Sequence, residues 1–302
     1  MLRSHLCIAA LVAALGGSRP ADACKTPSPC AALVAFANDA EATTALTSKD
    51  PAIAANAVFT LASSKHAPSV QGAERALLDG KLVTSILKAQ HGVRCLMPAV
   101  LRALAANPLG RAPFVALIKS KTWVEAPDRH DGSEPPTQLL RASGAIRPPP
   151  AEVIAFWKRH VGPDDGWVNV TVMALAENGS SEAIKLFDSL LRDPKHDVET
   201  RAAWLHSSFI AHRHEVLMLE MAASLLRAKL PAPLATAIGE VVFDYRQDWY
   251  GTCPGPRAPA IASYTPAARK LVRAIAPLVR AGKPDAELAT AITTMISALD
   301  KP

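Results

Sequence analysis

The stretch DVETRAAWLHSSFIAHRHEVLMLEMAASLL, residues 197–226, predicts two consecutive helices. Asp197 is a good helix N-cap, and Glu199 follows in the first turn, where a carboxylate meets the positive end of the helix dipole. From about residue 214 the second helix is apolar on nearly all sides, which predicts burial between neighbours. The first helix has one apolar stripe, with spacings of four, three and four residues, formed by Val198, Ala202, Leu205 and Phe209.

The same plan occurs 32 residues earlier, in DGWVNVTVMALAENGSSEAIKLFDSLLRDP (165–194). Gly179 predicts the end of its first helix, and the second helix is expected to end before Pro194. In both stretches the second helix is expected to begin about 17 residues after the aspartate. A fainter copy begins at Asp50. A period of about 30–40 residues in helix pairs is typical of an α-solenoid, in which each pair buries its apolar face against its neighbours.

The pattern D-x-x-x-R-A-A-x-L from Asp197 to Leu205, followed by a second amphipathic helix, resembles the HEAT-like (armadillo-type) helical repeat family. The resemblance is to its short bacterial type, and the copies at Asp165 and Asp50 match more weakly. It implies an all-α fold of antiparallel helix pairs and a surface that binds other proteins. It implies no catalytic residues.

The composition and the helix-breaking segments of the chain agree with an all-α fold. Aromatic residues make up 5% of the sequence, and alternating β-branched runs are nearly absent. A Pro-rich interruption at 121–150, containing one helix at 136–143, is expected to separate an N-terminal helical region (24–120) from a C-terminal one (151–302). Within the second region we predict a long loop at 249–265, which its cysteine would tether.

Residues 1–23 are predicted to be an export signal, because Arg3 and His5 precede an apolar run and an A-x-A cleavage pattern follows. The mature protein is then expected to begin at Cys24 and to be secreted or periplasmic. A lipid anchor at Cys24 is the disfavoured alternative, since Ala21 stands where such signals usually have Leu. No later stretch is expected to span a bilayer.

Four cysteines remain after cleavage, an even number in a chain that is expected to enter an oxidising compartment. They allow three pairings. We favour Cys24–Cys30 and Cys95–Cys253, because the first closes a short loop and leaves the distant pair for each other. The alternative is that Cys95, in an apolar run, is a buried free thiol.

The histidines near the centre of the quoted stretch do not form a predicted metal site. A zincin motif would need a second histidine four residues after His214-Glu215, and Met218 stands there. His206 and His212 are six residues apart and so cannot face one ion from a single helix. We expect His212 to have a capping or turn role.

A carboxylate ridge is the stronger candidate for binding. Like charges at this helical spacing repel one another, so the ridge calls for an explanation. It predicts a surface for a cationic or sugar-like ligand, and the two aromatic residues after it would supply flat contact area. The alternative is a solvated face neutralised by neighbours such as Arg246, with Trp249 covering the core. Pairing with a basic stripe at Arg269, Arg273 and Arg280 would be a further structural explanation. The ridge and its aromatic neighbours are Glu240, Asp244, Asp248, Trp249 and Tyr250.

Taken together, the sequence predicts an exported, non-catalytic repeat protein that binds another protein or an envelope-associated ligand in a groove. No nucleophile elbow, phosphate loop or cofactor motif is found, so no cofactor is expected. A nucleic-acid partner is excluded, because the basic residues are not interleaved with stacking aromatics and the chain is expected to leave the cytoplasm. The alternative function is a metal-dependent or carboxylate-based hydrolase of the cell envelope.

Overall fold

The structure, a computed structural model, describes residues 33–89, 93, 96–124, 135–163, 165–209, 212–228, 230–243 and 261–300. Within these ranges the chain is all-helical and has no strand, as predicted. None of the helices that the structure describes combines the length and apolarity needed to cross a membrane. The predicted export signal and the loop around residue 253 lie outside the described residues.

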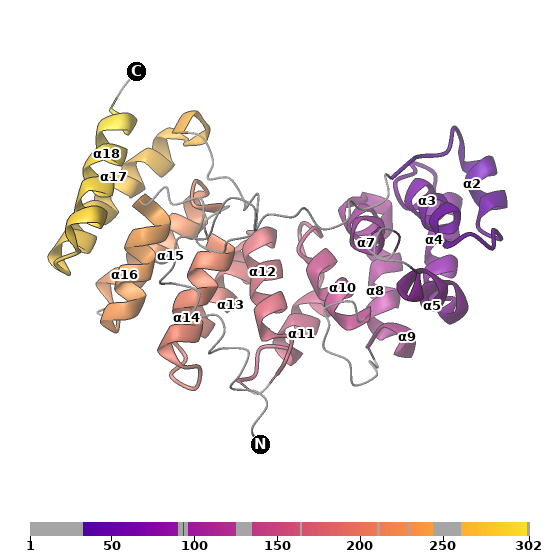
Figure 1. The fold of residues 1–302 in the computed structure, drawn as a ribbon, viewed down its shortest axis with the longest axis horizontal. Helices are drawn as coiled ribbons and strands as arrows, with labels where there is room; N and C mark the ends of the chain where they lie inside the picture. Colours follow the sequence, from indigo (N-terminus) through magenta and orange to yellow (C-terminus); the bar gives the residue numbers. More distant parts are fainter. Residues whose placement is uncertain are drawn as a thin grey trace, which may run out of the picture.

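Most helices pack in two rows along the longest axis of the molecule, with α2 (Asp39–Ala45) and α18 at opposite ends (Figure 1). In row A each helix contacts the next one in the row. Row A consists of α3 (Pro51–Ala62), α7 (Met97–Ala106), α10 (Pro135–Ser143), α12 (Val168–Asn178), α14 (Val198–Trp204), α16 (Ala232–Phe243) and α18 (Ala286–Leu299).

Row B packs against row A from one side. It consists of α4 (Ala67–Leu78), α8 (Arg111–Lys119) and α11 (Ala151–Arg159), followed by α13 (Ser181–Arg192), α15 (Val216–Arg227) and α17 (Pro266–Ala281). Contacts such as α3 with α4, α7 with α8 and α12 with α13 join the rows. Shorter elements at the N-terminal end and in the connections are α5 (Gly80–Lys88), α9 (Lys121–Val124) and the 3-10 turns Pro108–Gly110 and Ile261–Ser263.

The segment predicted as a Pro-rich interruption takes part in the core. It contains α10, as expected, and also α9, which the sequence reading did not anticipate. Trp123 of α9 is fully buried, and its Nε1 donates a hydrogen bond of 2.7 Å to the carbonyl of Leu77. Since α10 packs between α7 and α12, one cluster of buried apolar side chains continues from Ala42 to Leu299.

The residues that carry the repeat pattern join neighbouring helices. Arg201 is buried, and its Nη1 donates to the carbonyl of Leu191 at the end of α13, 3.0 Å away. Trp204 is 2% exposed, and its Nε1 donates to Oδ1 of Asn169 on α12 at 2.6 Å. Their role is therefore packing between the two stretches that share the pattern.

The second of these stretches departs from a regular helix pair. After α14 the chain continues as a π-helical segment, η4 (Leu205–Phe209), before α15 begins. As a result α15 starts 19 residues after Asp197 (216 − 197), whereas α13 starts 16 residues after Asp165 (181 − 165). The distance from the aspartate to the second helix thus differs by three residues between the two pairs, although the sequence pattern predicts about 17 for both.

Candidate functional site

Of the predicted carboxylate ridge, the described residues include only Glu240. It lies on α16, and its Oε2 is 3.2 Å from Nε2 of His206 in η4. Because His206 is 6% exposed, this pair joins η4 to the row A helix α16 and is largely shielded from solvent. The other ridge residues and the predicted disulfide cysteines lie outside the described residues: Asp244, Asp248, Trp249, Tyr250, Cys24, Cys30, Cys95 and Cys253.

Among the described residues, Glu240 forms no ion pair with the basic stripe on α17. Arg273 instead forms an ion pair with Asp300, with an N–O distance of 2.7 Å, and it donates to the carbonyl of Leu299. Arg269 also donates to the Leu299 carbonyl, at 3.3 Å. These arginines bind the C-terminal end of α18, where helix carbonyls lack partners and carry partial negative charge.

The predicted turn role of His212 agrees with its position between η4 and α15. Its Nδ1 lies 2.9 Å from Oε1 of Glu215, the residue that precedes α15. Burial raises the pKa of Glu215, but the hydrogen bond from His212 and the charges of His212, Arg147 and His214 outweigh it and hold the pKa below its usual value. In the part of the chain that the structure describes, no three His, Cys, Asp or Glu residues are grouped so as to hold a metal ion.

A pocket of about 470 Å³ lies between α7, α10 and α12, and we call it the central pocket. Three successive row A helices each contribute to it, so it extends across helix pairs instead of lying inside one. Small side chains from all three helices leave the space open. Its lining includes Ala99 and Arg102 of α7, Arg141 and Ala142 of α10, and Met173 and Glu177 of α12.

One side of the central pocket is an ion pair between distant parts of the chain. The Arg102 guanidinium meets the Glu177 carboxylate at N–O distances of 2.5 and 3.2 Å, and Arg147 donates to the backbone carbonyl of Glu177. Burial raises the pKa of the Glu177 carboxyl, against the opposing effect of the Arg102, His212 and Arg147 charges. The pair therefore holds Arg102 in a defined orientation at the edge of the pocket.

Two exposed groups complete the central pocket. Arg141 is exposed, and its guanidinium has no hydrogen-bond or ion-pair partner among the described residues. Met173 is 44% exposed, which is unusual for a large apolar side chain on a helix that is otherwise largely buried. An available guanidinium beside an exposed thioether suits a group that carries a carboxylate next to an apolar side chain.

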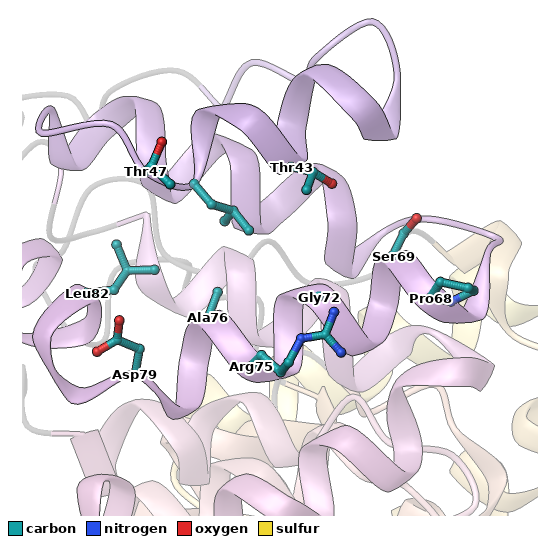
Figure 2. Close-up of a pocket in the computed structure, with 10 residues that line it drawn as sticks. Thr43, Thr47, Pro68, Ser69, Gly72, Arg75, Ala76, Asp79 and Leu82 are labelled. Carbon is teal, nitrogen blue, oxygen red and sulfur yellow. The ribbon is translucent and has the colours of Figure 1, made fainter.

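A second hollow, of about 560 Å³, lies at the N-terminal end of the array between α2, α4 and α5 (Figure 2). We call it the terminal pocket. Its polar lining includes Thr43, Ser69, Arg75 and Asp79. It has no residue in common with the central pocket, so the two can be tested separately.

Sequence reasoning did not identify Arg102, Arg141 or Glu177 as site residues. Each is a charged residue within a helical segment, in VLRAL, QLLRAS and MALAEN respectively. That charge is the only local signal of a site residue. Arg102 and Glu177 are 75 positions apart, and their pairing depends on α10 packing between α7 and α12. The pocket could not be located without the tertiary structure.

Comparisons of the chain with protein-family models, with curated proteins and with solved structures find no match.

Proposed function

We propose that this protein is an exported α-solenoid of HEAT-like repeats that binds another protein in a groove on its row A face, without a catalytic role. The observation that carries the proposal is the central pocket, which three successive row A helices line together. Stacked helix pairs form extended surfaces of this kind, and binding across several repeats is their usual function.

The chemistry of the pocket supports a protein partner with an acidic residue beside an apolar one. Arg141 is available to a carboxylate, and Arg102 is already oriented by Glu177. Met173 supplies an adaptable apolar contact. The export signal predicted at 1–23 places this interaction in the cell envelope or outside the cell.

Site-specific photocrosslinking in intact cells tests this proposal. A photoreactive amino acid at Met173 is expected to give a discrete adduct with one partner protein, whereas the same group at Leu217 is not. Leu217 is a matched control because it is an apolar residue of similar exposure, 39% against 44%, on the row B helix α15. Arg141→Glu and Ala99→Trp, which reverse the charge and fill the pocket, should each abolish the Met173 adduct.

Equal adducts at Met173 and Leu217, or an adduct that survives both pocket variants, would contradict binding at this site. The non-catalytic part of the proposal has its own test. Stoichiometric metal in the purified untagged protein, or a melting temperature that drops by several degrees with chelator, would favour the hydrolase alternative instead.

Export and disulfide formation are tested by the intact mass of the secreted or periplasmic protein. We expect a chain that begins at Cys24 and is lighter by four hydrogens, because two disulfides replace four thiols. Recovery of the uncleaved chain from the cytoplasm would contradict export. Four free thiols in the exported chain would contradict the disulfides while leaving export intact.

A further inference from the structure

The terminal pocket has an arginine whose charge no described residue neutralises. Arg75 of α4 is exposed, and its side chain makes no hydrogen bond or ion pair with the part of the chain that the structure describes. Asp79 follows it by four residues, a spacing that normally favours such a pair on a helix. Instead, the Arg75 side chain points away from Asp79 and toward Gly72 (Figure 2). Its Nη2 lies 3.9 Å from where a Cβ on Gly72 would be.

Three hydroxyl groups in this pocket each donate their proton to a hydrogen bond within the protein. Thr43 donates to the carbonyl of Asp39 at 2.7 Å, and Ser69 donates to the Asp39 carboxylate at 2.6 Å. Thr47 donates to the carbonyl of Thr44 at 3.0 Å. Because a hydroxyl has one proton and two lone pairs, each of these oxygens can only accept a further hydrogen bond. A ligand that satisfies them must carry N–H or O–H donors.

Asp79 places a negative charge at the other end of the pocket. Its Oδ1 accepts a hydrogen bond from the backbone N–H of Lys81 at 2.9 Å, as the N-cap of α5, and the side chain is exposed. Leu82 lies beside Asp79 at this end, and Ala76 lies between Asp79 and Arg75 (Figure 2). The pocket therefore separates a cation and an anion by an apolar wall, with the hydroxyl oxygens of Thr43 and Thr47 across from that wall and that of Ser69 on α4 itself.

We propose that the terminal pocket binds a short zwitterionic peptide. The ligand carboxylate pairs with Arg75, the ammonium group faces Asp79, and the N–H groups donate to the hydroxyl oxygens of Thr43, Thr47 and Ser69. A volume of about 560 Å³ accommodates a ligand of this size, since pockets for small molecules measure about 300–1,000 Å³. This site is separate from the central pocket and does not depend on the proposed protein partner.

Calorimetric titration of the full mature protein with trialanine tests the proposal. Trialanine is expected to bind saturably, and its C-terminal amide and its N-acetyl derivative should each bind about tenfold more weakly, because each lacks one charge-assisted contact. Arg75→Gln should weaken trialanine about tenfold without weakening the amide further. Asp79→Asn should weaken trialanine about tenfold without weakening the N-acetyl derivative further. Asparagine at this position preserves the α5 cap.

Arg141→Gln in the central pocket is the matched control, and it should leave trialanine binding unchanged. Gly72→Leu provides a second variant, because its side chain would enter the pocket without removing a charge, and it should abolish binding. Melting curves establish that each variant is folded. The proposal is overturned if trialanine does not bind, if the amide binds equally well, or if Arg75→Gln and Arg141→Gln have the same effect.

Discussion

The helix pairs α12–α13 and α14–α15 share one sequence plan but differ in how their two helices are connected. In the first pair, α12 ends at a left-handed Gly179 with φ of 64°, and Ser180 caps α13 immediately afterwards. In the second pair, a π-helical segment and a turn containing His212 occupy the connection. A repeat pattern therefore specifies the packing faces of its helices and leaves the connection free to vary.

The longer connection also has contacts that the shorter one lacks. The π-helical turn carries His206, which pairs with Glu240 of α16, and the following turn carries the His212–Glu215 pair. π-helical insertions widen a helix locally and are frequent at functional sites. Here the segment contacts both α12 and α16, so the insertion connects three members of row A.

The largest difference between the pairs is expected at the aligned positions Trp204 and Val172. Trp204→Ala should lower the free energy of unfolding by about 3–5 kcal/mol, because it empties a buried ring site and removes a hydrogen bond to Asn169. Val172→Ala removes two buried methyl groups and should cost about 1–2 kcal/mol. Urea denaturation of both variants measures the difference. Equal losses would mean that Trp204 does not join the two pairs.

The tight turn of the first pair is tested by Gly179→Ala, which should cost about 1–2 kcal/mol, because a side chain is disfavoured at this positive φ. The new Cβ would also lie 2.8 Å from Oε2 of Glu215, which precedes α15. Combining it with Glu215→Ala separates backbone strain from this contact. Gly162→Ala is the control, since nothing lies within 4 Å of its Cβ, and thermal melting should detect almost no change there.

The N-cap of α14 should contribute about 1 kcal/mol. Asp197 accepts a hydrogen bond from the Thr200 N–H at 2.7 Å. Burial raises the pKa of Asp197, but the hydrogen bonds from Thr200 outweigh this effect and hold the pKa below its usual value. A lowered folded-state pKa means that this stabilisation is present above the unfolded pKa and is lost as pH falls through the folded value. Asp197→Ala should therefore cost more at pH 6 than at pH 3 in urea denaturation, whereas Asp197→Asn should retain most of the cap.

The smallest expected effect concerns the two carboxyls where the pairs meet. The pKa of Glu215 is lowered, so its contribution is present above about 4.5 and is lost on acidification. The pKa of Glu177 is raised by burial, so its contribution is present below about 4.5 and is lost as pH rises. Relative to wild type, Glu215→Gln should lose more stability at pH 7 than at pH 4. Glu177→Gln should lose less stability at pH 7 than at pH 4. Each change should be under about 1 kcal/mol, because both groups are partly solvated. The same sign of pH dependence in melting curves of both variants would contradict the assignment.

Local signals in the sequence predicted some of the boundaries of these pairs. The cap at Asp197 and the end of α12 at Gly179 each depend on a residue and its immediate neighbours, and the structure places both as expected. The π-helical segment was missed, because the apolar spacing from Val198 to Phe209 is compatible with a regular helix. α9 was missed because it lies in the segment predicted to be a Pro-rich interruption. In addition, the hydrogen-bond partner of its Trp123 is Leu77, 46 residues away.

Residue spacing along a helix is a local property, so it was enough to predict that the described chain is all-helical and which faces of its helices are apolar. Which charges meet could be seen in the folded protein alone. It paired Glu240 with His206 and brought Arg269 and Arg273 of α17 to the C-terminal end of α18. It also assembled the central pocket from residues as far apart as Arg102 and Glu177. Such pairings depend on which helices become neighbours and in what register, and that follows from how the apolar faces of the whole array pack together.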